Sequence, residues 1–106
     1  EDIIVLNKAV GLVTHPGAGN WSGTLANALL HYEPKLATLD RAGIVHRLDK
    51  NTSGLMVVAR NEKSQKYLVE QLQTHSVSRE YSAIVYGHMV AGGTIDEPIS
   101  RDAKDR

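Results

Sequence analysis

The chain has 106 residues, the size of one small domain, and 42% of them are hydrophobic, which is enough for a modest core. Lys and Arg balance Asp and Glu at 12 each, so the overall charge gives no indication of a polyanionic partner. Cysteine is absent, which excludes a disulfide scaffold and a thiolate metal site, and no apolar run approaches the ~20 residues of a membrane span.

The first part of the chain predicts two short strands followed by a helix. Residues 3–6 are a β-branched apolar run typical of a buried strand, and residues 12–14 predict a second strand. Residues 15–20 form a loop, because Pro16 and two glycines break regular structure. Ser22 or Thr24 caps the helix that follows. Its apolar face has helical spacing and consists of Leu25, Ala28, Leu29 and Tyr32.

The rest of the chain predicts three or four further strands and one helix. Residues 33–42 are expected to be irregular, 44–45 a brief strand, 46–53 a polar loop, and the apolar run 54–59 a central strand. Asn61 is a good cap for a helix to about residue 75, with a stripe of Tyr67, Leu68, Gln71 and Leu72. Alternation over 79–86 predicts a strand, and 94–95 a last one. This order predicts an α+β fold with a mixed, largely antiparallel sheet and flanking helices.

Charge is unevenly distributed along the chain. Residues 41–66 hold six basic side chains and two acidic ones, a net charge of +4, whereas the flanking segments hold more acids than bases. Such a segment can attract phosphate, and it can equally be a solvated charged face.

The polar loop before the run 54–59 contains one carboxylate, Asp49, between the cations Arg47 and Lys50. A carboxylate at this position is held by a rigid element and remains open to a ligand. It is ionised at neutral pH and can act as a nucleophile or a base. The alternative is a structural turn, in which Asp49 accepts backbone N–H groups and pairs with Arg47 or Lys50.

Residues 46–55, with His46-Arg47-Leu48-Asp49 followed by Thr52-Ser53-Gly54-Leu55, are similar to the signature of the Rlu-type pseudouridine synthases. The resemblance extends over nearly the whole chain. Residues 7–17 resemble the first motif of the family, Arg79-Glu80-Tyr81 resembles the motif with the active-site Tyr, and residues 87–99 also read as family sequence. Residues 15–20 and 41–45 most resemble the RluD branch, which modifies large-subunit ribosomal RNA.

The resemblance implies an isomerase that converts uridine into pseudouridine in a ribosomal RNA stem-loop, without a cofactor or a metal and without a membrane partner. In that family the carboxylate corresponding to Asp49 is catalytic. The resemblance assigns Arg47 to the space that the flipped base leaves in the RNA, and Tyr81 to stacking on that base. His46 and Leu48 are assigned supporting roles, and Thr52, Ser53 and Gly54 are expected to shape the loop. The hydroxyls of Thr52 and Ser53 are expected to bond to local backbone, and Gly54 allows close approach. The expected location is the cytoplasm.

Two departures from the family pattern are minor: Ala9 stands where Pro is common, and Asn51 stands where an acid is frequent. A larger departure follows Asp96, where the C-terminal family motif with its basic partner for the carboxylate is not found. An N-terminal S4-type domain is not found either. We therefore expect residues 1–106 to be the N-terminal portion of a catalytic domain.

Other functions were weighed against this one. A kinase-like catalytic loop requires Asp directly after His-Arg, and here Leu48 intervenes. A metal hydrolase requires clustered ligands, and the five histidines are scattered without an i, i+4 pair. A non-catalytic RNA-binding module and an inactive fragment of the same fold stay open, as does the oligomeric state.

Overall fold

Two antiparallel strands form the centre of the molecule. The structure, a computed structural model, describes residues 1–17 and 19–100. Strand β1 (Ile3–Lys8) pairs with β2 (Gly54–Ala59), so that Ile3 lies opposite Ala59 and Lys8 opposite Gly54. Both strands are rich in Ile, Val and Leu, which favour a pleated, half-buried surface. The strands predicted at 3–6 and 54–59 are confirmed.

The second edge of β2 carries only a single bridge. Val58 pairs with Ile4 of β1 and also forms an isolated antiparallel bridge with Ile44. The brief strand expected at 44–45 is therefore reduced to one bridging residue. Among the described residues the sheet has two strands, so the fold class is α+β as predicted, but the larger mixed sheet is not formed.

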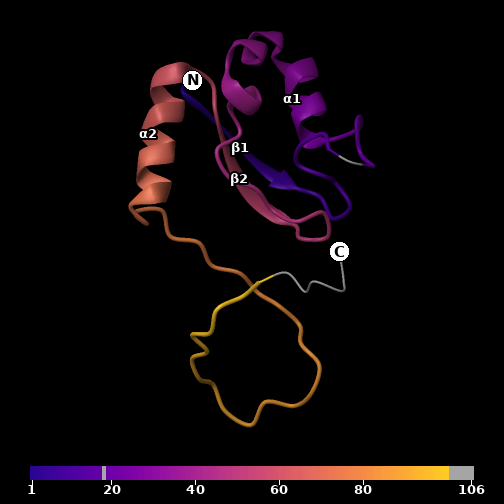
Figure 1. The fold of residues 1–106 in the computed structure, drawn as a ribbon, viewed down its shortest axis with the longest axis vertical. Coiled ribbons are helices and arrows are strands. Elements are labelled where there is room, and N and C mark those ends of the chain that lie inside the picture. Colours follow the sequence, from indigo (N-terminus) through magenta and orange to yellow (C-terminus); the bar gives the residue numbers. More distant parts are fainter. Residues whose placement is uncertain (18, 101–106) are drawn as a thin grey trace.

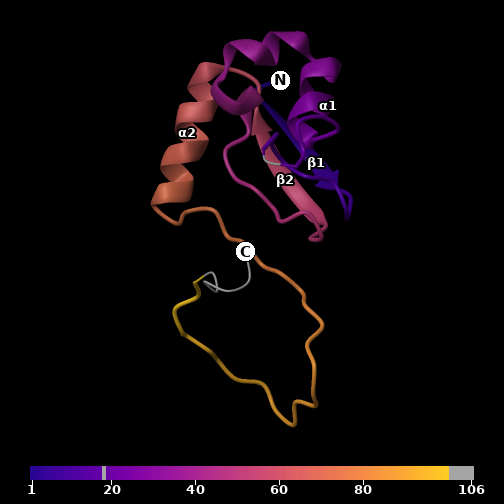
Figure 2. The same cartoon turned by 45° about the vertical axis from the view of Figure 1, so that its right-hand side comes forward.

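Helix α1 (Leu25–Tyr32) lies on one side of the two strands, and α2 (Glu62–Gln73) lies on the other (Figures 1 and 2). Thr24 begins α1: its hydroxyl accepts the N–H of Asn27, and the Asn27 side chain accepts the N–H of Thr24. This reciprocal capping satisfies two N–H groups that a helix start leaves free. The predicted apolar face is only half right, because Leu25 and Leu29 are buried whereas Ala28 and Tyr32 are exposed.

Two short 3₁₀ turns follow α1, in the segment that was expected to be irregular. They are η1 (Pro34–Thr38) and η2 (Asp40–Gly43). A bidentate ion pair ties the start of this segment to the residue after β2: the Arg60 guanidinium donates to both carboxylate oxygens of Glu33. These hydrogen bonds lower the pKa of the Glu33 carboxyl.

The core lies between one face of the sheet and the segment from α1 to η2. Alternate residues of β2, Met56 and Val58, are completely buried on this face, and the half-buried Ile4 and Leu6 of β1 pack beside them. The opposing apolar side chains come from α1, the 3₁₀ turns and the loop before β2: Leu25, Ala26, Leu29, Leu36, Ala42, Ile44 and Leu48. Burying one large aliphatic side chain contributes about 1.5–3 kcal/mol, so this cluster accounts for most of the local stability.

Helix α2 begins as predicted at Asn61, whose side chain accepts the N–H of Ser64 at 2.8 Å. Of its predicted stripe, Leu68, Gln71 and Leu72 are half-buried, and Tyr67 is exposed. No described helix is long and apolar enough to cross a membrane.

Residues 12–14 do not form the predicted strand. Instead, the carbonyl oxygens of Val13 and Thr14 accept the N–H groups of Leu25 and Ala26 at 2.7 and 2.9 Å. The segment therefore bonds to the start of α1 rather than to another strand. The local apolar pattern gave no indication of this partner.

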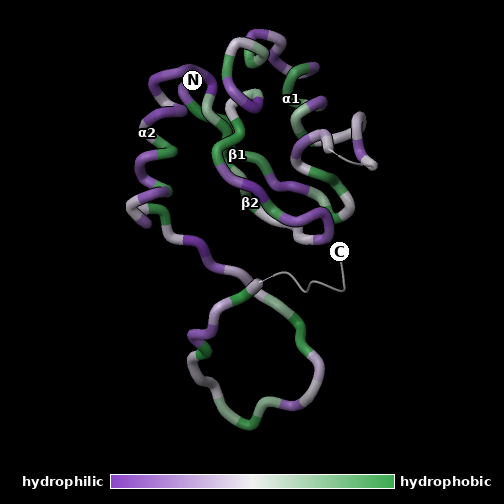
Figure 3. Tube along the Cα trace, viewed as in Figure 1, coloured by the Kyte–Doolittle hydropathy of each residue, from purple (hydrophilic) through white to green (hydrophobic). Residues whose placement is uncertain are grey.

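The strands predicted at 79–86 and 94–95 are also wrong. Residues 78–100 form an extended segment that loops away from the sheet, with apolar stretches along it (Figures 1 and 3), and all of these residues are exposed. Ile84 and Tyr86 are fully exposed. A strand needs a neighbour for its backbone hydrogen bonds, and no described segment pairs with this one.

Candidate functional site

The loop 46–53 is held to the rest of the molecule through its backbone. The Thr14 hydroxyl donates to the carbonyl of Leu48 at 3.0 Å, and the Gly11 N–H donates to the carbonyl of Lys50 at 2.7 Å. The N–H of Thr52 closes a turn onto the carbonyl of Asp49 at 3.0 Å. Three successive parts of the loop are thus fixed without using the side chain of Asp49.

A buried lysine strengthens this attachment. Lys8 is only 1% exposed, and its three ammonium N–H groups match three carbonyl oxygens: Ala9 at 3.0 Å, Leu12 at 2.7 Å and Lys50 at 3.2 Å. A buried cation is costly unless it is hydrogen-bonded, and here each donor has an acceptor. Lys8 therefore joins β1, the turn after it and the loop 46–53 at one point.

The side chains of the loop alternate between core and solvent. Leu48 is buried in the core cluster, whereas Arg47 and Asp49 on either side of it are exposed. Among the described residues the Asp49 carboxylate accepts no hydrogen bond and forms no ion pair, so the structural turn with a bonded Asp49 is not observed there. A fixed backbone therefore presents an available carboxylate.

His46 anchors the other end of the loop to β2. Its Nε2 accepts the backbone N–H of Val57 at 3.1 Å, so in the neutral ring the proton is on Nδ1. Burial, and secondarily the charge of Arg79, lower the pKa of His46. The hydrogen bond fixes the imidazole against β2, and the orienting role of His46 stays a prediction. Its Nδ1 is buried without a partner among the described residues.

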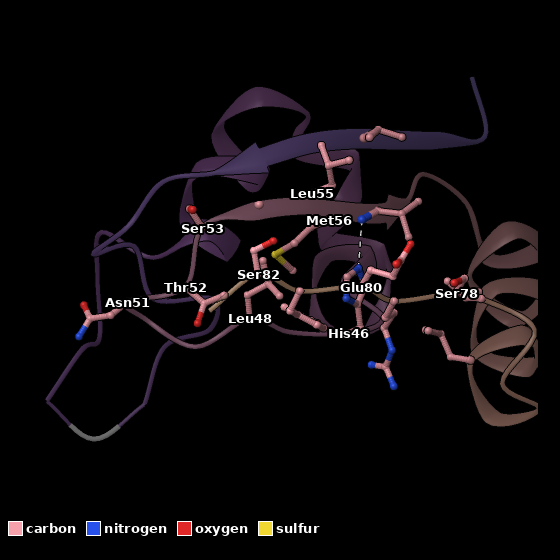
Figure 4. Close-up of a pocket in the computed structure, with 17 residues that line it drawn as sticks. His46, Leu48, Asn51, Thr52, Ser53, Leu55, Met56, Ser78, Glu80 and Ser82 are labelled. Carbon is pink, nitrogen blue, oxygen red and sulfur yellow. Dashed lines mark hydrogen bonds between the residues drawn. The ribbon is translucent and has the colours of Figure 1, made fainter. Parts of the chain in front are cut away.

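A pocket of about 660 Å³ lies beside this loop (Figure 4). It brings together six of the eight residues that the sequence singled out: His46, Leu48, Thr52, Ser53, Gly54 and Tyr81. Residues 77–82 form one wall, and β2 forms another. Arg47 and Asp49 are not among the lining residues, so the structure separates the two charged side chains from this pocket.

Tyr81 lines the pocket from an extended segment instead of the predicted strand, and it is 61% exposed. One expected detail of the loop is also wrong, because among the described residues the hydroxyls of Thr52 and Ser53 make no backbone hydrogen bond. A Cβ at Gly54 would meet no protein atom within 4 Å, and the close approach expected there stays a prediction. Gly54 is instead suited to its backbone, because its φ of +132° is rarely adopted by other residues.

The structural roles of Lys8 and Thr14 were missed at the sequence level. A signal was present for Lys8, since it continues the alternation of Ile4 and Leu6 and therefore lies on the core face of β1. In residues 1–17 and 19–100, no group of three His, Asp or Glu side chains is arranged to hold a metal ion.

The chain is 61% identical over its full length to a protein of Escherichia coli (strain K12) named ribosomal large subunit pseudouridine synthase D. It is 59% and 57% identical, again over its full length, to proteins of the same name from Yersinia pestis and Xylella fastidiosa (strain Temecula1). The chain spans about a third of the length of these curated relatives, 32% or 33%. Because the family model for RNA pseudouridylate synthase matches residues 2–106, the chain belongs to the RNA pseudouridylate synthase family.

Proposed function

We propose that this chain is the N-terminal portion of the catalytic domain of an RNA pseudouridine synthase that isomerises uridine in large-subunit ribosomal RNA. One observation carries the proposal: in a member of this family, a backbone-fixed loop presents Asp49 to solvent without any described structural partner. A carboxylate that braces a turn accepts hydrogen bonds from the backbone of that turn, and the Asp49 carboxylate accepts none among the described residues. Large-subunit ribosomal RNA is the substrate in the names of the relatives, and we propose the same substrate, and hence the cytoplasm, for this protein.

The reaction breaks the bond between uracil N1 and ribose C1′, turns the base and rejoins it through C5. Asp49 is an exposed carboxylate near Arg47 and Lys50 in the sequence, so it is suited to act as a nucleophile at C1′ or C6, or to assist formation of a glycal. No electron transfer or phosphoryl transfer is involved, so the chemistry rests on one carboxylate and on correct placement of the base.

The uridine must leave the RNA stack before it can react, which costs a few kcal/mol. We assign Arg47, exposed two residues before Asp49, to the space that the base vacates in the RNA. Tyr81 is assigned to stacking on the flipped base, a contact worth about 1–3 kcal/mol. Its ring is 61% exposed and is therefore accessible to a base. His46, Leu48 and residues 52–54 support the loop.

The decisive experiment replaces Asp49 with Asn in the full-length protein. Asn has nearly the same shape, so ribosomal RNA binding is expected to persist while pseudouridine formation is abolished. The matched control is Glu70→Gln on the exposed part of α2, which removes another carboxylate and should leave turnover unchanged. Substantial product from the Asn variant would refute the catalytic role of Asp49, whereas RNA binding without product from the parent protein would favour a non-catalytic RNA-binding module. Pseudouridine mapping in cells lacking the gene provides an independent check.

A second experiment addresses base flipping. Arg47→Ala is expected to slow modification of a folded stem-loop more than that of an unstructured oligonucleotide, because the arginine stabilises the flipped state. Equal losses on both substrates would mean that Arg47 only holds phosphate.

A further inference from the structure

Thr14 carries a buried hydroxyl that reaches the backbone immediately before Asp49. The residue is only 2% exposed, and its Oγ1 donates to the carbonyl of Leu48 at 3.0 Å, across 34 positions of the sequence. The Leu48 carbonyl and the Asp49 N–H belong to the same planar peptide group. A hydrogen bond to this carbonyl therefore also fixes the orientation of the peptide group that leads into Asp49.

The peptide group on the other side of Asp49 is held as well. The Asp49 carbonyl accepts the N–H of Thr52 at 3.0 Å, which closes a turn inside the loop. The Cα of Asp49 thus lies between two hydrogen-bonded peptide groups, so the direction of its Cα–Cβ bond is set and the rotations about its side-chain bonds remain free. Of these two hydrogen bonds, the one from Thr14 relates this direction to the rest of the molecule, because the other lies within the loop.

Thr14 is itself anchored to the first turn of α1. The Thr14 carbonyl accepts the Ala26 N–H at 2.9 Å, and the Val13 carbonyl accepts the Leu25 N–H at 2.7 Å. Leu25 and Ala26 are both buried in the core, so the backbone that presents the hydroxyl is bonded to a packed helix. The position of the hydroxyl is therefore set independently of the loop that it orients.

Lys8 holds the loop at a different point. Its ammonium group donates to the Lys50 carbonyl, which lies one residue beyond Asp49. The Leu48 carbonyl, in contrast, has the Thr14 hydroxyl as the only donor described for it. Loss of this hydroxyl would leave the peptide group before Asp49 without a described hydrogen bond at its carbonyl.

We propose that Thr14 is a positioning residue for pseudouridine formation: its hydroxyl orients the Leu48–Asp49 peptide group so that the Asp49 carboxylate points toward the reacting nucleotide. The proposal rests on the proposed function, in which Asp49 is the catalytic carboxylate. Because Thr14 is buried, it acts through Asp49 and not by contact with the RNA. Misplacing a reacting group by about 1 Å can reduce a rate about 100-fold, so the hydroxyl is expected to affect catalysis more than RNA binding.

The test compares Thr14→Val with Thr14→Ser in the full-length protein. Val has nearly the shape of Thr but no hydroxyl, whereas Ser keeps the hydroxyl and loses the methyl group. In Thr14→Val, kcat on a ribosomal RNA transcript is expected to fall between about 10-fold and 100-fold, while KM and the affinity for the RNA stay near the parent values. Thr14→Ser should recover most of kcat.

A control and a correction separate orientation from stability. Thr38→Val is the matched control, because the Thr38 hydroxyl also donates to a backbone carbonyl, that of Lys35 at 2.9 Å, but within η1. This variant should leave kcat and KM unchanged. A residue that only stabilises the fold lowers the amount of folded protein and leaves the kcat of each folded molecule unchanged. Turnover is therefore divided by the folded fraction that a denaturation curve gives at the assay temperature.

Three results would overturn the positioning role. A parent-like kcat per folded molecule in Thr14→Val would show that the hydroxyl is not needed to orient Asp49. An equal loss of kcat in Thr14→Ser would assign the effect to the shape of the side chain, and a Thr14→Val protein that does not fold would assign Thr14 to the fold alone. Each result leaves the proposed function standing if Asp49→Asn still abolishes turnover, whereas a parent protein that forms no pseudouridine would refute the proposed function itself.

Discussion

Lys8→Met tests whether a buried ammonium group holds the loop of Asp49. Met retains much of the length and apolar volume of the lysine stem but has no N–H to donate. The three acceptors are affected differently. The Lys50 carbonyl keeps the Gly11 N–H at 2.7 Å and the Ala9 carbonyl keeps the Leu12 N–H at 3.4 Å, whereas the Leu12 carbonyl loses the only donor described for it.

The expected loss of stability in Lys8→Met follows from the number of carbonyls that are left without a donor. A buried carbonyl left without a donor costs about 1–3 kcal/mol, and removing the buried charge recovers part of what the two weakened contacts lose. A net cost of about 2 kcal/mol raises the population of molecules in which the loop 46–53 is detached roughly 30-fold. The loop then holds Asp49 less well, so turnover is expected to fall while affinity for RNA changes little.

Hydrogen–deuterium exchange on the full-length protein measures this opening at two amides, Gly11 bonded to Lys50 and Thr52 bonded to Asp49. Both should exchange about 30-fold faster in Lys8→Met. The matched control is Lys66→Met, because the same substitution is made at an exposed lysine of α2. If the Lys8 variant exchanged and turned over like this control, the buried cation would have no part in holding the loop.

Two further predictions concern other supports of the site. Protonating His46 on Nε2 removes the hydrogen bond from the Val57 N–H. Burial, and secondarily Arg79, lower the pKa of His46 in the folded protein below the ordinary 6.5, so the unfolded chain takes up the proton first as the pH falls. The stability that this hydrogen bond contributes is therefore complete above pH 6.5 and is lost as the pH falls through the lower folded-state pKa. Carbon-13 NMR of the histidine rings checks this, and a His46 midpoint above 6.5 would contradict it. Gly43→Ala places a Cβ 2.1 Å from the Ala59 carbonyl oxygen at a φ of +85°, so it should destabilise the domain by about 2–4 kcal/mol. Gly17→Ala has open space and an ordinary φ, and a similar denaturation midpoint for the two variants would show that the close approach at Gly43 is unimportant.

The elements that the sequence predicted well are those with a local cause. Thr24 and Asn61 cap the two helices through their own side chains, and the β-branched runs at 3–6 and 54–59 favour extended backbone wherever they lie. The strands predicted at 79–86 and 94–95 depend on a neighbour, which a local pattern cannot supply. Residues 12–14 have the composition of a strand, but their carbonyls bond to the start of α1 instead.

The candidate site also has parts that follow from the local sequence and parts that depend on distant residues. The position of Asp49 in a loop before a buried strand followed from the sequence, and the structure adds that its carboxylate has no described partner. What the sequence could not supply is the long-range support: the Thr14 bond to Leu48, the Lys8 bond to Lys50 and the left-handed turn at Arg41. These features depend on burial or on backbone geometry, which residue type predicts only weakly.

The pairing of β1 with β2 also has a consequence for the order of folding. Ile3 pairs with Ala59 and Lys8 with Gly54, so each contact closes a loop of roughly fifty residues, whereas both capped helices form from neighbouring residues. During synthesis β1 must wait, unpaired, until β2 emerges from the ribosome. Lys8 cannot reach the Lys50 carbonyl before that moment. The loop of Asp49 therefore takes its final shape only when the sheet closes, and a nascent chain stalled before residue 54 has α1 without a site.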